Sequence, residues 1–71
     1  MKTNLISLDN GHSYLTAAEA MPKIIEHNLW DTVTEYMDDE TREEVYREDE
    51  YSQEDFLRRY LELAHDNLII G

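Results

Sequence analysis

Residues 52–64 read Ser-Gln-Glu-Asp-Phe-Leu-Arg-Arg-Tyr-Leu-Glu-Leu-Ala, and they give the clearest helix signal in the chain. Its apolar side chains recur at i, i+1, i+4, i+5 and i+8, the spacing of one face of an amphipathic α-helix. They are Phe56, Leu57, Tyr60, Leu61 and Ala64. Ser52 can cap this helix, and the acids after it suit the positive end of the helix dipole. The pattern predicts a helix with a core face on one side and Arg58 and Arg59 on the other.

A second helix is predicted near residue 16, where Thr-Ala-Ala-Glu matches the capping-box pattern. Pro22 leaves two alternatives, because its ring clashes with the carbonyl four residues earlier and it has no N–H to donate. Either one kinked helix covers 17–27, or a short turn precedes a helix that starts at Pro22. In both cases we expect Ile24 and Ile25 to face the core.

Two further helices are predicted in the middle of the chain. Asn28 is a candidate N-cap for the first, in which Trp30 and Val33 form the expected central core pair. The second covers 39–48 and has only Val45 and Tyr46 as large apolar residues. We therefore expect this second helix to lie on the surface with a narrow buried stripe.

The two ends of the chain favour a small sheet. Residues 5–15 predict a hairpin, since Asn10-Gly11 is a strong turn signal between short apolar runs. The β-branched run in 67–71 is either a third strand or an apolar tail packed on the helices. The predicted fold is mainly α (α+β), a single domain over 1–71 with three to four short helices and an N-terminal hairpin that the C-terminal segment can join.

The charge is concentrated in one segment. The 17 Asp+Glu and 6 Lys+Arg give a formal net charge of −11, and residues 31–55 carry −10 of it through twelve acids and two bases. Such a chain lacks the clustered cations that bind phosphates, and an anionic membrane would repel it. We therefore expect no direct nucleic-acid or membrane partner. The chain has no Cys and its first residues lack the apolar stretch of a signal peptide, so we expect a cytoplasmic protein.

Three residue clusters contain side chains that could bind a metal or act in catalysis. Glu62 and His65 have the Glu-x-x-His spacing of carboxylate-bridged metal sites, but a second such motif is missing. The run 38–40 could bind a divalent cation, although it lacks the spacing of a calcium loop and is more simply helix capping. Asp9, His12 and Ser13 crowd one turn. We expect no enzyme, no metal and no cofactor.

Several stretches together resemble a group of small acidic proteins encoded on conjugative transposons of Gram-positive bacteria. They are LDNG at 8–11, TAAEAMP at 16–22, LWD at 29–31, MDDETRE at 37–43, FLxxYLELA at 56–64 and DxLIIG at 66–71. The resemblance covers nearly the whole chain and implies a mobile genetic element as its setting. A looser pattern, LWDxV at 29–33 followed by an acidic helix and SxE at 52–54, is similar to the antirestriction proteins of such elements, which are acidic DNA mimics.

The sequence thus favours a non-enzymatic acidic module that binds a protein with a basic surface. The expected partner-binding residues are Asp38, Asp39, Glu40, Glu43, Glu44, Tyr46, Glu48, Asp49, Glu50 and Tyr51. Three alternatives stay open: the acids only keep the chain soluble, they mimic DNA against a host restriction or CRISPR nuclease, or the protein is an assembly factor that acts as a homodimer. Tyr46 and Tyr51 belong either to an interface or to local packing.

Overall fold

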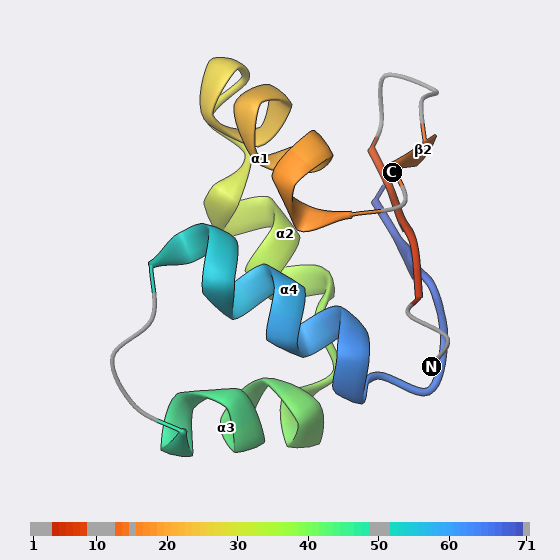
Figure 1. The fold of residues 1–71 in the computed structure, drawn as a ribbon, viewed down its shortest axis with the longest axis vertical. Helices are drawn as coiled ribbons and strands as arrows, with labels where there is room; N and C mark the ends of the chain where they lie inside the picture. The colour runs from red at the N-terminus through yellow and green to blue at the C-terminus, as the bar shows by residue number, and fades with distance from the viewer. Residues whose placement is uncertain (1–3, 9–12, 15, 49–51, 71) are drawn as a thin grey trace.

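The computed structural model describes residues 4–8, 13–14, 16–48 and 52–70 (Figure 1). These residues form four helices and three short strands, which confirms the mainly α fold with a small β part. The elements are β1 (Ile6–Ser7), β2 (Ser13–Tyr14), α1 (Ala17–Glu26), α2 (Trp30–Tyr36), α3 (Asp39–Arg47), α4 (Gln53–Leu63) and β3 (Leu68–Ile69). No helix in the described part is both long and apolar enough to cross a membrane.

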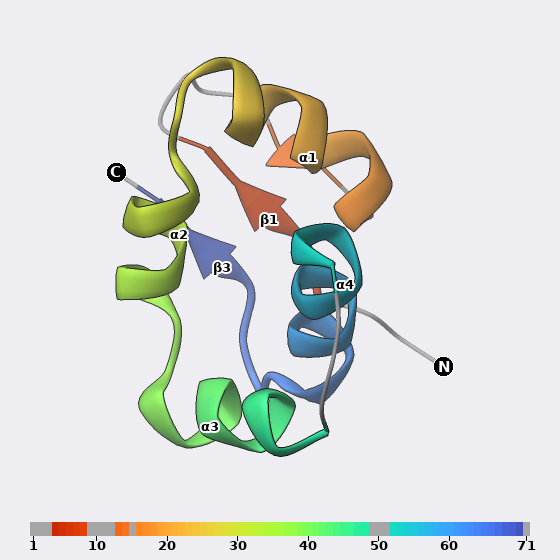
Figure 2. The same cartoon turned by 90° about the vertical axis from the view of Figure 1, so that its left-hand side faces the viewer.

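The sheet joins both ends of the chain in the order β2-β1-β3 (Figure 2). Strand β1 pairs antiparallel with β2, with Ile6 opposite Tyr14, as expected for a hairpin. It pairs in parallel with β3, with Ile6 opposite Leu68. Of the two alternatives for the C-terminal run, the structure has the third strand. The Asn10-Gly11 turn lies outside the described residues.

Helix α1 is one helix with Pro22 inside it, and the Thr16 hydroxyl accepts a hydrogen bond from the Glu19 backbone N–H at 3.2 Å, as the capping box predicts. The prediction that both isoleucines face the core is wrong. Ile24 is fully buried, whereas Ile25 is 66% exposed. Consecutive helical residues point about 100° apart, so an apolar stripe takes one of the two and leaves the other in solvent.

Asn28 does not cap α2, which corrects the sequence-based assignment. It adopts φ 53, and α2 has Leu29 at its N-cap position with no side-chain cap. The Asn28 N–H donates to the Ile25 carbonyl at 3.1 Å, and the Leu29 N–H donates to the Ile24 carbonyl at 2.8 Å. This is the Schellman arrangement that ends a helix with one left-handed residue, a conformation that Asn tolerates. Asn28 therefore ends α1.

The core lies around α4, which packs between α1 and α3 (Figure 1). Its face of Phe56, Leu57, Tyr60 and Leu61 is buried, as its periodicity predicts. Strand residues from both ends of the chain complete the same core. Val33 is fully buried, but Trp30 is only partly buried and meets Phe56 edge-on at a centroid distance of 6.0 Å. Trp30 therefore borders the core, whereas the sequence placed it at the centre.

The neighbouring isoleucines of α1 provide a test of this core. Ile24→Ala should lower the free energy of unfolding by about 2–5 kcal/mol, because it removes fully buried methylene and methyl groups. Ile25→Ala, the matched control, should change it by about 0.5 kcal/mol or less. Urea unfolding followed by circular dichroism measures both. Equal effects of the two substitutions would contradict the orientation of α1.

Candidate functional site

Helix α3 lies on the surface and carries five of the ten residues that the sequence assigns to partner binding. It spans Asp39–Arg47 and buries Thr41 and Val45 against the rest of the protein. Asp38 caps it: the carboxylate accepts hydrogen bonds from the Thr41 N–H and from the Thr41 hydroxyl, each at 3.1 Å. Part of this carboxylate's hydrogen-bonding capacity therefore serves the fold, while its negative charge stays at the surface.

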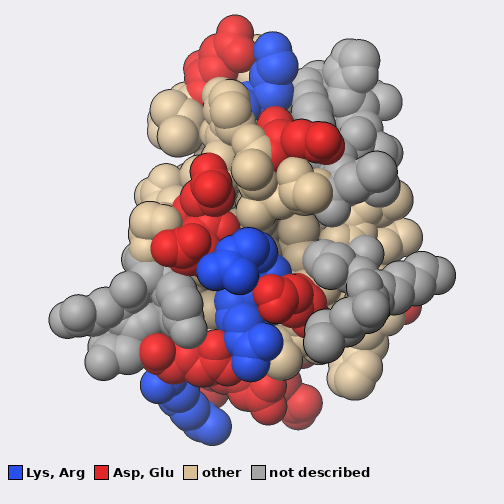
Figure 3. Space-filling model, in the orientation of Figure 1, with Lys and Arg blue, Asp and Glu red and all other residues tan. Residues whose placement is uncertain are grey.

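Three of the expected binding acids are paired with arginines. Asp39 lies 2.8 Å from Arg42, and Glu43 lies 3.9 Å from Arg47. Glu48 accepts two hydrogen bonds from the Arg59 guanidinium, from Nε at 2.7 Å and from Nη2 at 3.1 Å. Carboxylate and arginine side chains accordingly alternate over α3 and α4 (Figure 3). These pairs reduce the field that the acids project into solvent.

Two acids of α3 have no arginine or lysine partner among the described residues. Glu40 and Glu44 are exposed, lie one helical turn apart, and form no ion pair within the part of the chain that the structure describes. Tyr46, on the opposite flank of the helix, is 63% exposed, and its ring packs against that of Phe56 at 4.8 Å. Glu40, Glu44 and Tyr46 are therefore exposed side chains of α3 that no ion pair among the described residues engages. Asp49, Glu50 and Tyr51 lie outside the described residues.

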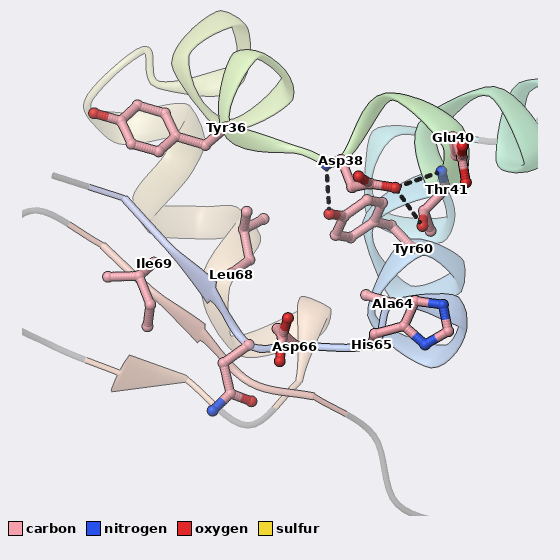
Figure 4. Close-up of a pocket in the computed structure, with 11 residues that line it drawn as sticks. Tyr36, Asp38, Glu40, Thr41, Tyr60, Ala64, His65, Asp66, Leu68 and Ile69 are labelled. Carbon is pink, nitrogen blue, oxygen red and sulfur yellow. Dashed lines mark hydrogen bonds between the residues drawn. The ribbon is translucent and has the colours of Figure 1, made fainter.

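A groove of about 530 Å³ lies beside α3, and the sequence did not predict it (Figure 4). Its walls come from the connection between α2 and α3, from the C-terminal end of α4 and from the segment that leads into β3. Tyr36 and Ile69 both belong to its lining, and they are 49% and 59% exposed. No local motif indicates the groove, because it forms only when residues about 30 apart in the sequence come together in the fold.

Tyr60 fixes one wall of this groove. Its hydroxyl accepts a hydrogen bond from the Asp38 backbone N–H at 2.8 Å, which ties the start of α3 to the buried face of α4. Burial raises the pKa of the Tyr60 phenol above its usual 10.0, and the nearby Asp38 carboxylate adds to the rise, while the hydrogen bond and Arg42 oppose it. The un-ionised phenol is therefore the form that the fold favours.

Metal binding gains no support at the positions considered from the sequence. Among the described residues, no three His, Cys, Asp or Glu side chains gather in an arrangement that could hold a metal ion. Glu62 lies 3.5 Å from Arg58 and 3.7 Å from Arg59, so two guanidinium groups occupy the carboxylate that the Glu-x-x-His reading assigned to a metal.

Comparison with known proteins adds no relative: no family model, no curated protein and no solved structure matches the chain.

The raised pKa of Tyr60 predicts a loss of stability in alkali. The unfolded chain ionises this phenol near pH 10, whereas the folded chain holds its proton to higher pH. The contribution of Tyr60 is therefore fully present below pH 10 and lost as the pH rises through the folded-state pKa. In urea titrations between about pH 8 and 11, Tyr60→Phe should remove this part of the alkaline loss. Tyr46→Phe should leave it in place, and a wild-type slope in Tyr60→Phe would contradict the assignment.

Proposed function

We propose that this protein is a non-enzymatic acidic module that binds a protein with a basic surface, in the cytoplasm of a bacterium that carries a mobile genetic element. The main support for the proposal is Tyr46 on the acid-rich helix α3. Its ring is exposed and packs against the ring of Phe56 in α4. An aromatic side chain that is already ordered loses little conformational entropy on binding, and Tyr is enriched among the residues that dominate interface energies.

The acids of α3 supply the second part of the recognition. Glu40 and Glu44 present charge that no described cation neutralises. Asp39 and Glu43 are exposed, and each carboxylate can exchange its arginine for a cation of the partner. Charges at the rim of an interface mainly raise the association rate and reject acidic competitors. The acids would thus steer a basic partner to the surface, and Tyr46 would anchor it.

DNA mimicry is the competing proposal, and the arginines weigh against it. Helix α3 contains four acids and two arginines, a net charge of −2 over nine residues. At 1.5 Å per residue this helix is about 13.5 Å long, a length over which duplex DNA carries about eight charges. The net charge density of α3 is about a quarter of that of DNA. A partner whose binding is displaced competitively by duplex DNA would favour mimicry all the same.

The distribution of exposed apolar side chains favours a different protein over a second copy as the partner. The large exposed apolar residues in the described part are Ile25, Tyr36, Tyr46 and Ile69. They belong to four different elements, α1, α2, α3 and β3, and although Tyr36 and Ile69 line the same groove, the four do not form one apolar patch on a single element. Single exposed apolar residues are common on monomers, whereas dimer interfaces have a contiguous apolar core. A mass that rises with concentration and ignores salt would instead favour the homodimer.

The proposal predicts that two substitutions on α3 weaken capture of a partner from a lysate of a Gram-positive bacterium. Glu44→Lys with Tyr46→Ala should raise the dissociation constant of the recovered complex at least about tenfold, since it removes the anchor and reverses one charge. Glu26→Lys with Ile25→Ala is the matched control on α1, because it changes the net charge equally and truncates a side chain of similar exposure. Equal binding by both double variants would contradict the proposal.

A further inference from the structure

Strand β3 lies at one edge of the sheet, and the backbone N–H and C=O of one of its residues form no hydrogen bond within the described part of the chain. The Leu68 N–H donates to the Leu5 carbonyl at 3.0 Å, and the Ile70 N–H donates to the Ser7 carbonyl at 2.8 Å. Alternate residues of a parallel strand pair with the same neighbour, so the N–H and C=O of Ile69 point to the other side. Ile69 has no hydrogen-bond partner in the described structure.

The groove runs beside this open edge. In Figure 4, Tyr36 lies beside β3 on the side away from β1 and β2. Tyr36 and the two residues of β3 all belong to the lining of the groove. Its volume of about 530 Å³ is within the range of peptide- and ligand-binding clefts. The exposed side chains of Ile69 and Tyr36, which both belong to its lining, offer apolar contacts. An extended segment of about four residues, roughly 13 Å long, matches the pairing length that 67–70 provides.

The charge of the groove selects the kind of segment. Asp38, Glu40 and Asp66 contribute to its lining, and none of the described lining residues is Lys or Arg. A basic segment would therefore meet opposite charges along the groove. A second copy of this chain, paired edge to edge through β3, would bring its own Asp66 and groove acids against these, which like-charge repulsion disfavours.

We propose that the groove binds an extended, basic segment of a partner protein, which adds to the sheet as a strand beside β3. The inference rests on the proposed function, in which the partner is basic, and it adds where and in which conformation one of its segments binds. Backbone hydrogen bonds to Ile69 would supply affinity that depends little on sequence. The acids of the groove and the ring of Tyr36 would select segments in which basic and apolar residues alternate.

The test uses a capped peptide of about eight residues in which Lys and Val alternate, titrated into the isotope-labelled full chain by NMR. Ile69→Pro removes only the outward N–H, because the N–H bonds to β1 come from Leu68 and Ile70. It should weaken binding at least about tenfold, since the ring also obstructs the incoming strand. Ile69→Val keeps the N–H and should bind within about twofold of wild type. Equal binding by the Pro and Val variants would overturn the proposal.

A second arm leaves the protein unchanged. The same peptide with alternate backbone nitrogens methylated keeps its charge but cannot form a strand ladder, and it should bind at least about tenfold more weakly. The parent peptide should also slow hydrogen exchange at the Ile69 amide. Equal affinities of the two peptides, with shifts on the outer face of α3 and none in the groove, would overturn the groove proposal while supporting the proposed function. Absence of binding at any surface would overturn the groove proposal, whereas the proposed function is decided separately by the α3 variants.

Discussion

The buried face of α4 is the constraint on which the rest of the structure depends. Leu57 and Leu61 are almost fully buried, and Tyr60 reaches from the same face to the backbone of Asp38. Burial of each large apolar side chain contributes about 1.5–3 kcal/mol, and a domain of this length has only about 4–10 kcal/mol of net stability. The contacts of α4 with α1 and α3 therefore decide whether the protein folds, and they set where α3 presents its acids.

The outer face of α4 then decides which acids remain available. Arg59 binds Glu48 at the end of α3, and Arg58 lies between Asp55 and Glu62. These exposed pairs contribute little stability each, but they neutralise charge along α4 and, through Arg59 and Glu48, between α4 and the end of α3. The unpaired acids of α3 lie elsewhere on that helix, and Glu40 among them borders the groove. The negative charge of α3 is therefore unevenly distributed: arginines neutralise part of it beside α4, and Glu40 and Glu44 keep theirs without an ion pair among the described residues.

The local parts of this structure could be predicted from the sequence, and the tertiary parts could not. The caps at Thr16 and Ser52 and the core face of α4 follow from patterns within one helical turn or two. The position of Asn28 is ambiguous in the sequence, because Asn suits both a helix start and a left-handed helix end. Ile24 and Ile25 point about 100° apart on α1, so a narrow apolar stripe buries only one of them, and the apolar pair alone does not say which. The groove joins Tyr36 to Ile69, and no local pattern links such distant residues.

Site-specific photo-crosslinking tests most directly whether a partner binds at the face of α3 around Tyr46. A benzophenone amino acid would replace Tyr46 in one variant and Ile25 in another, since these two side chains are 63% and 66% exposed. If a partner binds at this face, a lysate should give one discrete crosslinked species from position 46, lost in high salt, and none from position 25. Equal crosslinking from both positions, or none from position 46, would contradict it.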